Sequence, residues 1–228
     1  AVDRADNRGR TPMDAARDFN HDALVVLLRE QLDSKFPLHA AVRTGDVATM
    51  TQLLDGGTVV DQAKGDGATP LFVACDNGHV DAARLLLDKG AEVDRADKNG
   101  QTSLYIACEK GHVDAARLLL DKGAEVDRAD KNGQTSLYIA CEKGHVEAAR
   151  LLLGKGAAVD RAREDGWTPL HGVCNCWECE DSHVEMVRLL LANGADVDQA
   201  TKDGQTPLDF AKSKDHSSIV ALLEEHQK

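Results

Sequence analysis

Apolar residues recur along the chain in paired blocks, and one pair shows what the pattern predicts. The run 102–110 begins with a threonine suited to a helix N-cap and ends before Gly111, which permits a left-handed C-cap. A second block begins near Val113, holds three consecutive leucines and ends at Gly123. Isolated helices of fewer than about 12 residues are marginal in water. The pattern therefore predicts two short antiparallel helices that are stabilised by stacking on neighbouring pairs.

This helix-pair pattern repeats along almost the whole chain. Residues 94–126 recur 33 positions later as residues 127–159, with three substitutions. Weaker copies of the same motif lie around Asp66, Asp165, Asp203, Phe36 and Asn7. A fixed period of this length is typical of solenoid proteins, in which each unit contacts only its neighbours. The sequence thus predicts seven stacked units, numbered one to seven in chain order.

The clearest copy of the motif lies in residues 165–197, which contain DGWTPLHGV, SHVEMVRLLL and GADV in that order. These residues resemble the ankyrin repeat. The resemblance implies a hairpin finger and two antiparallel helices per unit, stacked into a curved solenoid whose fingers and inner helices form a concave binding surface. The predicted fold class is therefore all-α, an α-solenoid with short β-hairpin fingers arranged as an ankyrin-repeat stack.

Irregular copies of the repeat set the predicted domain boundaries. An irregular, cap-like repeat occupies residues 1–35, and the solenoid occupies residues 36–228. The solenoid divides into an N-cap-like repeat 36–63, the repeats 64–96, 97–129, 130–162 and 163–200, and a C-cap repeat 201–228. The chain opens on residues that match the middle of a repeat, so it is expected to be a fragment of a longer protein.

Unit one has the polar residues of a closing cap at its stacking positions. Its residues Asp14, Arg17 and Asn20 match the cap-like series Asp209, Lys212 and Asp215 of unit seven. Neither a finger nor a threonine N-cap precedes the first helix of unit two, which predicts a break or kink near residues 30–36. Because one unit cannot bury its own apolar face, unit one is expected to pack on unit two, with lost upstream sequence as the alternative.

Composition narrows the classes of partner. The chain has 39 acidic and 27 basic residues, a net charge of −12. This charge repels phosphate backbones, which excludes nucleic acid and anionic membranes as partners. No stretch approaches the roughly 20 apolar residues of a membrane helix. A partner protein or peptide with a basic surface is favoured instead. The chain itself is predicted to be a monomer without a cofactor.

Most cysteines and histidines follow the repeat, which argues against catalysis or metal binding. Four cysteines recur at one apolar position of the first helix, namely Cys75, Cys108, Cys141 and Cys174. Stacked helices lie roughly 8–10 Å apart, too far for a disulfide, so these four are predicted to be reduced core residues. Reduced thiols are typical of the cytoplasm or nucleus. The recurring histidine between the two helices is expected to hydrogen-bond loop backbone between units.

Unit six departs from the repeat through a five-residue insertion between its helices. Cysteine and histidine alternate there with short spacings that zinc accepts, in the series Cys174, Cys176, Cys179 and His183. Cys174 and His183 are already explained by the repeat, and two remaining thiols do not complete a tetrahedral site. The preferred interpretation is an extended loop with two incidental thiols at Cys176 and Cys179. A structural zinc site is the alternative.

The repeat also predicts which residues face a partner. In units four and five these are the finger tips and the first-helix residues that point the same way: Lys98, Asn99, Gln101, Tyr105, Glu109, Lys131, Asn132, Gln134, Tyr138 and Glu142. Both tryptophans, Trp167 in the finger of unit six and Trp177 in the insertion, are expected to project to the same side without a role in the core. The alternative is that the inserted loop folds back and buries one tryptophan against the other. Tryptophan is enriched in binding hot spots, so both are predicted partner-binding residues.

The function predicted from these features is a non-enzymatic protein-protein interaction scaffold that binds on its concave face. No motif typical of a catalytic nucleophile, a phosphate-binding loop or a zinc protease is present. Two alternatives remain open at this stage. The chain could be a regulatory or substrate-targeting module of a larger enzyme, or a module stabilised by zinc at the insertion 174–183.

Overall fold

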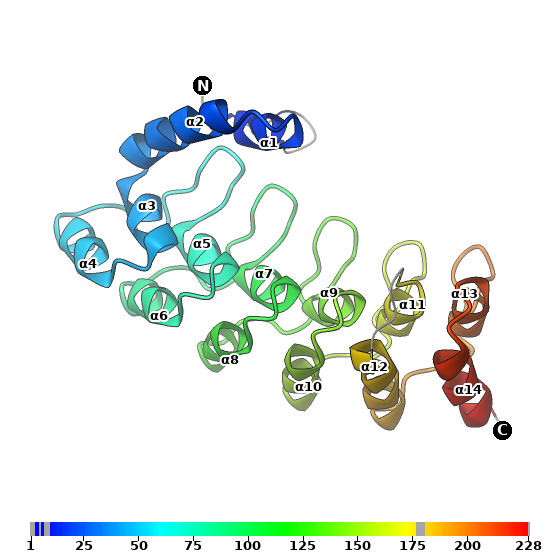
Figure 1. Cartoon of the computed structure of the whole chain (residues 1–228). Helices are drawn as coiled ribbons and strands as arrows, with labels where there is room; N and C mark the ends of the chain where they lie inside the picture. The colour runs from blue at the N-terminus through cyan, green and yellow to red at the C-terminus, as the bar shows by residue number, and fades with distance from the viewer. Residues whose placement is uncertain (1–2, 5, 7–9, 177–180, 228) are drawn as a thin grey trace.

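The computed structural model describes residues 3–4, 6, 10–176 and 181–227. Within these residues the chain forms consecutive helix pairs and no β-strand (Figure 1). The first three pairs are α1 (Pro12–Asp18) with α2 (Asp22–Lys35), α3 (Pro37–Thr44) with α4 (Val47–Asp55), and α5 (Pro70–Asp76) with α6 (Val80–Asp88). The remaining pairs are α7 (Ser103–Glu109) with α8 (Val113–Asp121), α9 (Ser136–Glu142) with α10 (Val146–Gly154), α11 (Pro169–Cys174) with α12 (Asp181–Ala192), and α13 (Pro207–Ser213) with α14 (Ser217–His226).

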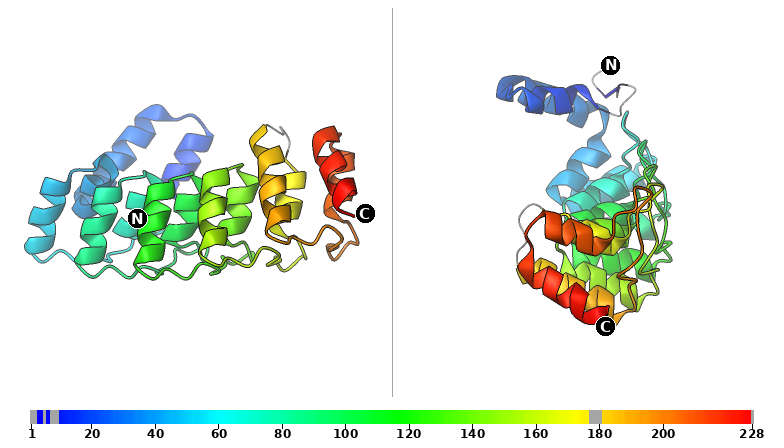
Figure 2. Two further views of the ribbon diagram at one scale, coloured as in Figure 1. Left: turned by 90° about the horizontal axis from the view of Figure 1, so that it is seen from below. Right: turned by 90° about the vertical axis from the view of Figure 1, so that its right-hand side faces the viewer.

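From α3 onward the pairs stack in two rows. The first helices pack side by side in an inner row, the second helices form an outer row, and the loops between pairs project as fingers beside the inner row (Figures 1 and 2). One continuous apolar core runs through the stack from Leu38 to Leu223. The prediction of an all-α solenoid of helix pairs is confirmed. None of the helices in the described ranges combines the length and the apolar character that crossing a bilayer demands.

Local sequence explains where the helices of a unit begin and how units are joined. The threonine before each of five inner helices accepts a hydrogen bond from the backbone N–H three residues later; these are Thr69, Thr102, Thr135, Thr168 and Thr206. The histidine before the outer helix donates through Nε2 to a carbonyl of the preceding unit. His112 reaches Asp76 at 3.2 Å and His145 reaches Glu109 at 2.9 Å. The predicted hydrogen bond from this histidine to the backbone of an adjacent unit is confirmed, and the acceptor belongs to the preceding unit.

The fingers are tight turns and contain no β-strand in the described residues, which corrects the prediction of β-hairpins. In unit four, the N–H of Asp97 donates to the carbonyl of Gln101 at 2.9 Å, and the N–H of Lys98 donates to Asp66 of the preceding finger at 3.0 Å. The N–H of Gly100 also donates to the carbonyl of Asp97 at 3.1 Å, which closes a turn, and these few bonds do not form a strand ladder. The fingers are therefore held by turn geometry and by their neighbours.

Unit one lies outside the regular stack. Only Phe36 separates α2 from α3, and α1 and α2 lie above the fingers of the first units instead of continuing the two rows (Figures 1 and 2). Met13, Ala16 and Leu28 form a small core of their own, separate from the main core. The kink expected near residues 30–36 is present. Packing of unit one on unit two is confined to the junction, where Arg43 pairs with Asp33 at 2.6 Å.

Units one and seven have the same local structure but different surroundings. Asn20 and Asp215 take the same left-handed conformation, with φ of 53° and 59°, and both first helices carry a threonine–aspartate capping box. Leu222 of unit seven is 8% exposed because it packs against unit six, whereas its equivalent Leu27 is 52% exposed. The apolar face that unit seven buries is therefore open to solvent in unit one.

Candidate binding surface

The two tyrosines predicted to contact a partner are buried in the inner row. Tyr105 is 3% exposed and Tyr138 is 2% exposed. The hydroxyl of Tyr105 donates to Oε1 of Gln134 at 3.2 Å, and the hydroxyl of Tyr138 accepts from Arg163 at 3.0 Å, so each reaches the finger of the next unit. Burial raises the pKa of both hydroxyls, which keeps them protonated at neutral pH. The prediction that these rings are exposed for binding is wrong, because the next unit covers them.

The other predicted residues of units four and five remain accessible to different degrees. The finger-tip residues Lys98, Asn99, Lys131 and Asn132 are exposed. The residues closer to the helices are half-buried, namely Gln101, Gln134, Glu109 and Glu142. Both finger tips share one turn: Oδ1 of Asp97 accepts from the N–H groups of Asn99 and Gln101 at 2.8 Å each, and Asp130 does the same in unit five. These tips are rigid, polar and repeated.

Unit six has an arginine where units four and five have the finger aspartate. Arg163 takes the place of Asp130, and its guanidinium donates to Tyr138 at 3.0 Å and to Oδ2 of Asp165 at 2.7 Å. Oδ1 of Asp165 accepts from the N–H of Trp167 at 3.3 Å and so supports the turn that the missing aspartate would hold. Arg163 is only 25% exposed, and its guanidinium lies between the rings of Tyr138 and Trp167, 5.3 and 5.7 Å from their centroids.

Trp167 packs between units six and seven. Its ring lies 4.5 Å from the ring of Phe210 and 6.0 Å from that of His171, and the side chain is half-buried against the main core. The prediction that Trp167 has no packing role is therefore wrong. The ring of Trp167 packs on Phe210 of the next unit. The sister fingers have no aromatic residue opposite them at this position. Trp177, the second predicted tryptophan, lies outside the described residues.

A hollow of about 860 Å³ opens beside these residues on the finger side of units five and six. Tyr138, Arg163 and Trp167 line it together with Gly172, which occupies the position of Ile139 in unit five. A Cβ built on Gly172 would lie 3.4 Å from the ring of Tyr138. The hollow exists because an isoleucine is absent here. Sequence reasoning missed both Arg163 and Gly172. At each of these two positions units four and five carry the same residue and unit six carries a different one, which is a signal that the sequence alone offers.

Replacing Gly172 by alanine should raise the free energy of unfolding by about 0.5–1 kcal/mol, because glycine is a poor residue for a helix interior. The added methyl group meets Tyr138 at an ordinary contact distance of 3.4 Å, so no strain opposes the gain. Chemical denaturation of the two proteins measures the difference. A loss of stability would show that the floor of the hollow is more crowded than the structure indicates.

The four repeat cysteines are free and buried, as predicted. Burial raises the pKa of each thiol, to about 12 for Cys108 and Cys174, so thiolate is scarce at neutral pH. We expect Cys75, Cys108, Cys141 and Cys174 to resist alkylation by iodoacetamide in the folded protein and to react fully in denaturant. Mass spectrometry of time points follows each site. Labelling of all four at the rate of a free peptide thiol would contradict their buried placement.

The insertion of unit six offers no complete metal site in the described residues. No group of three or more His, Cys, Asp or Glu side chains is close enough there to hold a metal ion. Cys176 is disulfide-bonded, so the prediction that it is an incidental free thiol is wrong and its sulfur is not a thiolate ligand. Its carbonyl accepts from Nε2 of His216 at 2.9 Å. Cys179, the other thiol predicted for the insertion, lies outside the described residues.

Comparison with known proteins agrees with the architecture. The sequence matches the family of ankyrin repeats, in sets of three copies, over residues 12–97, 38–130, 92–163, 127–177 and 156–228. The chain therefore belongs to the ankyrin-repeat family. It is similar to a crystal structure of an ankyrin repeat domain from Acinetobacter baumannii AYE, with 32% sequence identity, a TM-score of 0.75, and coverage of 83% of this chain and 96% of that one. The comparison with curated proteins found no match.

Proposed function

We propose that the chain is a non-enzymatic scaffold that binds a partner protein or peptide on the finger side of units three to six. Ankyrin repeats are typically protein-binding modules and are usually non-catalytic, which supports this class of function. The observation that carries the location is the hollow of units five and six. It combines an aromatic ring, a guanidinium and half-buried amide groups in one concave place, the composition that interface hot spots favour.

The accessible part of this surface consists of the finger tips and the rim of the hollow. A partner side chain that enters beside Gly172 would contact the edge of Trp167 and the hydroxyl of Tyr138. The exposed tips at Asn99 and Asn132 would contact the partner backbone through their amide groups. Units four and five present the same polar tips twice, so an extended peptide would meet equivalent groups in succession.

Charge supports a basic partner. The net charge of −12 gives the chain a negative field that steers cationic surfaces toward it. Glu142 and Asp165 line the hollow itself. Each is paired with a cation, Glu142 with Lys143 at 3.7 Å and Asp165 with Arg163 at 2.7 Å, so the hollow itself is close to neutral and the attraction comes from the charge of the whole chain. Association with such a partner is therefore faster at low salt than at high salt.

Gly172→Ile tests the location, because isoleucine is the residue that unit five carries at this position and it fills the hollow. We expect it to weaken partner capture at least about tenfold, the scale of one lost hot-spot contact, without lowering the melting temperature. Arg117→Gln on the exposed outer helix α8 is the matched control. Quantitative capture from a cell lysate, followed by titration of the captured partner, measures both. Equal binding by all three proteins would place the interface elsewhere.

A further inference from the structure

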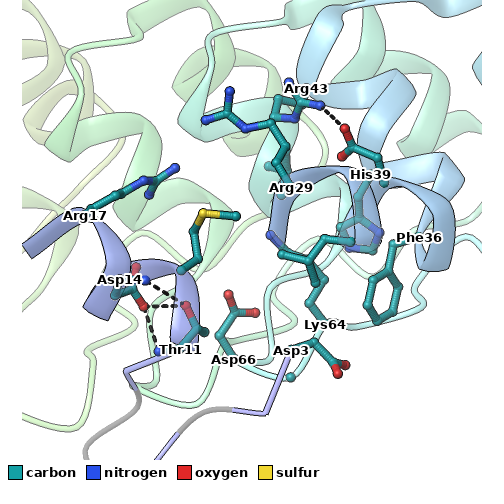
Figure 3. A pocket seen from close by; sticks show the side chains of 15 residues that line it. Asp3, Thr11, Asp14, Arg17, Arg29, Phe36, His39, Arg43, Lys64 and Asp66 are labelled. Atoms are coloured by element: carbon teal, nitrogen blue, oxygen red, sulfur yellow. Dashed lines mark hydrogen bonds and ion pairs between the residues drawn. The ribbon is translucent and has the colours of Figure 1, made fainter. Parts of the chain in front are cut away.

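A second cavity lies at the other end of the molecule, between unit one and the start of the stack (Figure 3). Its volume is about 150 Å³, and its walls come from α1, α2, α3 and the finger of unit three. This is the size of cavity that holds a benzene ring in other proteins. The cavity is separate from the hollow of units five and six.

Every carboxylate on the cavity wall already has a partner. Asp14 accepts from the backbone and hydroxyl of Thr11, at 2.8 and 2.7 Å. Asp33 pairs with Arg43 at 2.6 Å, and Asp3 pairs with Lys35 at 2.7 Å. The fourth carboxylate, that of Asp66, accepts from the N–H of Ala68 at 2.9 Å. The charges of Asp33 and Asp3 are therefore neutralised by cations, whereas Asp14 and Asp66 accept from neutral donors and keep their negative charge.

Of the four cations that line the cavity, only Arg43 forms an ion pair with a described residue. Arg17 on α1, Arg29 on α2 and Lys64 in the finger of unit three make no ion pair with any described residue, and all three line the one cavity. Figure 3 shows Arg17 and Arg29 reaching over the cavity from different helices, with Lys64 at its centre. Convergence of three uncommitted cations is unusual in a chain with a net charge of −12. Set against the two carboxylates that keep their charge, Asp14 and Asp66, the three cations leave a local excess of one positive charge, which an anion would neutralise.

The floor of the cavity is apolar. Met13 and Val73 are 8% exposed and Phe36 is 4% exposed, and Leu32 packs on the small core of unit one. These side chains come from α1, α5, α2 and the junction between α2 and α3. A ring or short aliphatic group placed here would contact apolar atoms contributed by both unit one and the stack, while the exposed Arg17 and Arg29 lie at the rim.

The sequence of the unit-three finger is adapted to this junction. Gly65 stands where three sister fingers have Lys98, Lys131 and Lys202. A Cβ on Gly65 would overlap the carbonyl oxygen of Asp3, so any side chain there would displace the N-terminal segment. Its own backbone does not require a glycine, since its φ is outside the left-handed region. The glycine therefore serves the contact that closes the cavity.

We propose that this cavity binds a small organic anion, a carboxylate or phosphate monoester carried on one ring or a short apolar chain. The anionic group would lie among Arg17, Arg29 and Lys64, and the apolar body would lie on Met13 and Phe36. Such a ligand contacts unit one and the stack at once and thus fixes the orientation of α1 and α2. This site is independent of the proposed partner surface, so either can fail without the other.

The test uses the full chain with benzoate and phenyl phosphate as anionic probes, and benzyl alcohol and inorganic phosphate as probes that lack one half of the chemistry. Isothermal titration and chemical-shift mapping are expected to show saturable binding of the two anions with Kd at or below about 5 mM, and much weaker binding of the other two. Bound ligand should slow amide exchange in α1 and α2.

Two variants and a control assign the site. Lys64→Gln and Arg29→Gln should each weaken benzoate binding about fivefold, the effect of removing one charge near a solvated anion. Arg117→Gln, an exposed arginine on α8, should leave it unchanged. The proposal is overturned by absence of saturable binding up to about 20 mM probe, or by binding that both charge variants leave intact. Equal affinity for benzyl alcohol and benzoate would also overturn it.

Discussion

Replacing Leu222 by alanine is expected to lower the free energy of unfolding by about 2–5 kcal/mol, whereas the same change at Leu27 should cost less than about 0.5 kcal/mol. The two leucines occupy equivalent positions in units of the same local structure. Leu222 is 8% exposed and packs on unit six, so its truncation leaves a cavity at a unit interface. Leu27 is 52% exposed and has little burial to lose. Urea denaturation monitored by circular dichroism compares the two variants with the wild type.

Comparing Leu222→Ala with Leu27→Ala is informative because both leucines occupy the same position in their helix and differ only in whether a neighbouring unit covers them. A loss of more than about 2 kcal/mol for Leu27→Ala would mean that another surface buries the open face of unit one in solution. Repeating the measurement over a wide range of protein concentrations separates burial by a second copy, which is concentration-dependent, from burial within one chain.

Acidification from pH 7 to pH 5 is expected to destabilise the chain through His39. Burial lowers the pKa of this histidine to about 4, against an ordinary value of 6.5. Between these two values the unfolded chain binds a proton that the folded chain does not, so lower pH favours unfolding. At pH 5 the cost from this one group is about 2 kcal/mol, and it is absent above pH 7.

His39→Gln isolates this contribution, since glutamine can still donate to the carbonyl of Ala68, which Nε2 of His39 reaches at 3.1 Å. The difference in unfolding free energy between wild type and variant should shrink as the pH falls from 7 to 5. Buried aspartates such as Asp97, whose pKa is raised by burial, act in the opposite direction but are common to both proteins. A pH-independent difference would show that His39 titrates normally in the folded state.

His39 also shows what the kink changes locally. In unit six, Nδ1 of His171 accepts from the backbone of Thr168 at 3.1 Å. The equivalent residue in unit two is Phe36, whose N–H instead donates to Leu32 at 2.8 Å because α2 runs directly into the junction. Nδ1 of His39 is left buried without a partner among the described residues. The missing threonine that predicted the break thus has a visible consequence.

The repeat made much of the fold predictable from sequence. Thr102 and its counterparts marked helix starts, and Cys108 and its counterparts marked the buried side, because both depend on spacing within one unit. The burial of Tyr105 and Trp167 was not predictable in this way. It depends on what the following unit places opposite each ring, Gln134 in one case and Phe210 in the other. A period gives the register of a side chain but not the shape of its neighbour.

The orientation of unit one relative to the stack was not predictable from the sequence, for a related reason. Its own helices and caps follow the repeat, but no finger links it to unit two, so no repeated contact sets its orientation. The sequence signal for the position of unit one is Gly65, a glycine that replaces the lysine of sister fingers although the backbone there does not require glycine. Such a departure from sister units is readable only once the neighbouring backbone is known.

Amide hydrogen exchange of the isolated chain and of its complex with the captured partner tests whether the partner binds on the finger side at units five and six. We expect slower exchange in the complex for residues 130–142 and 163–176, with the outer helices α8 and α10 unchanged. Protection confined to α8, α10 and α12, with the finger side exchanging as in the free chain, would contradict it.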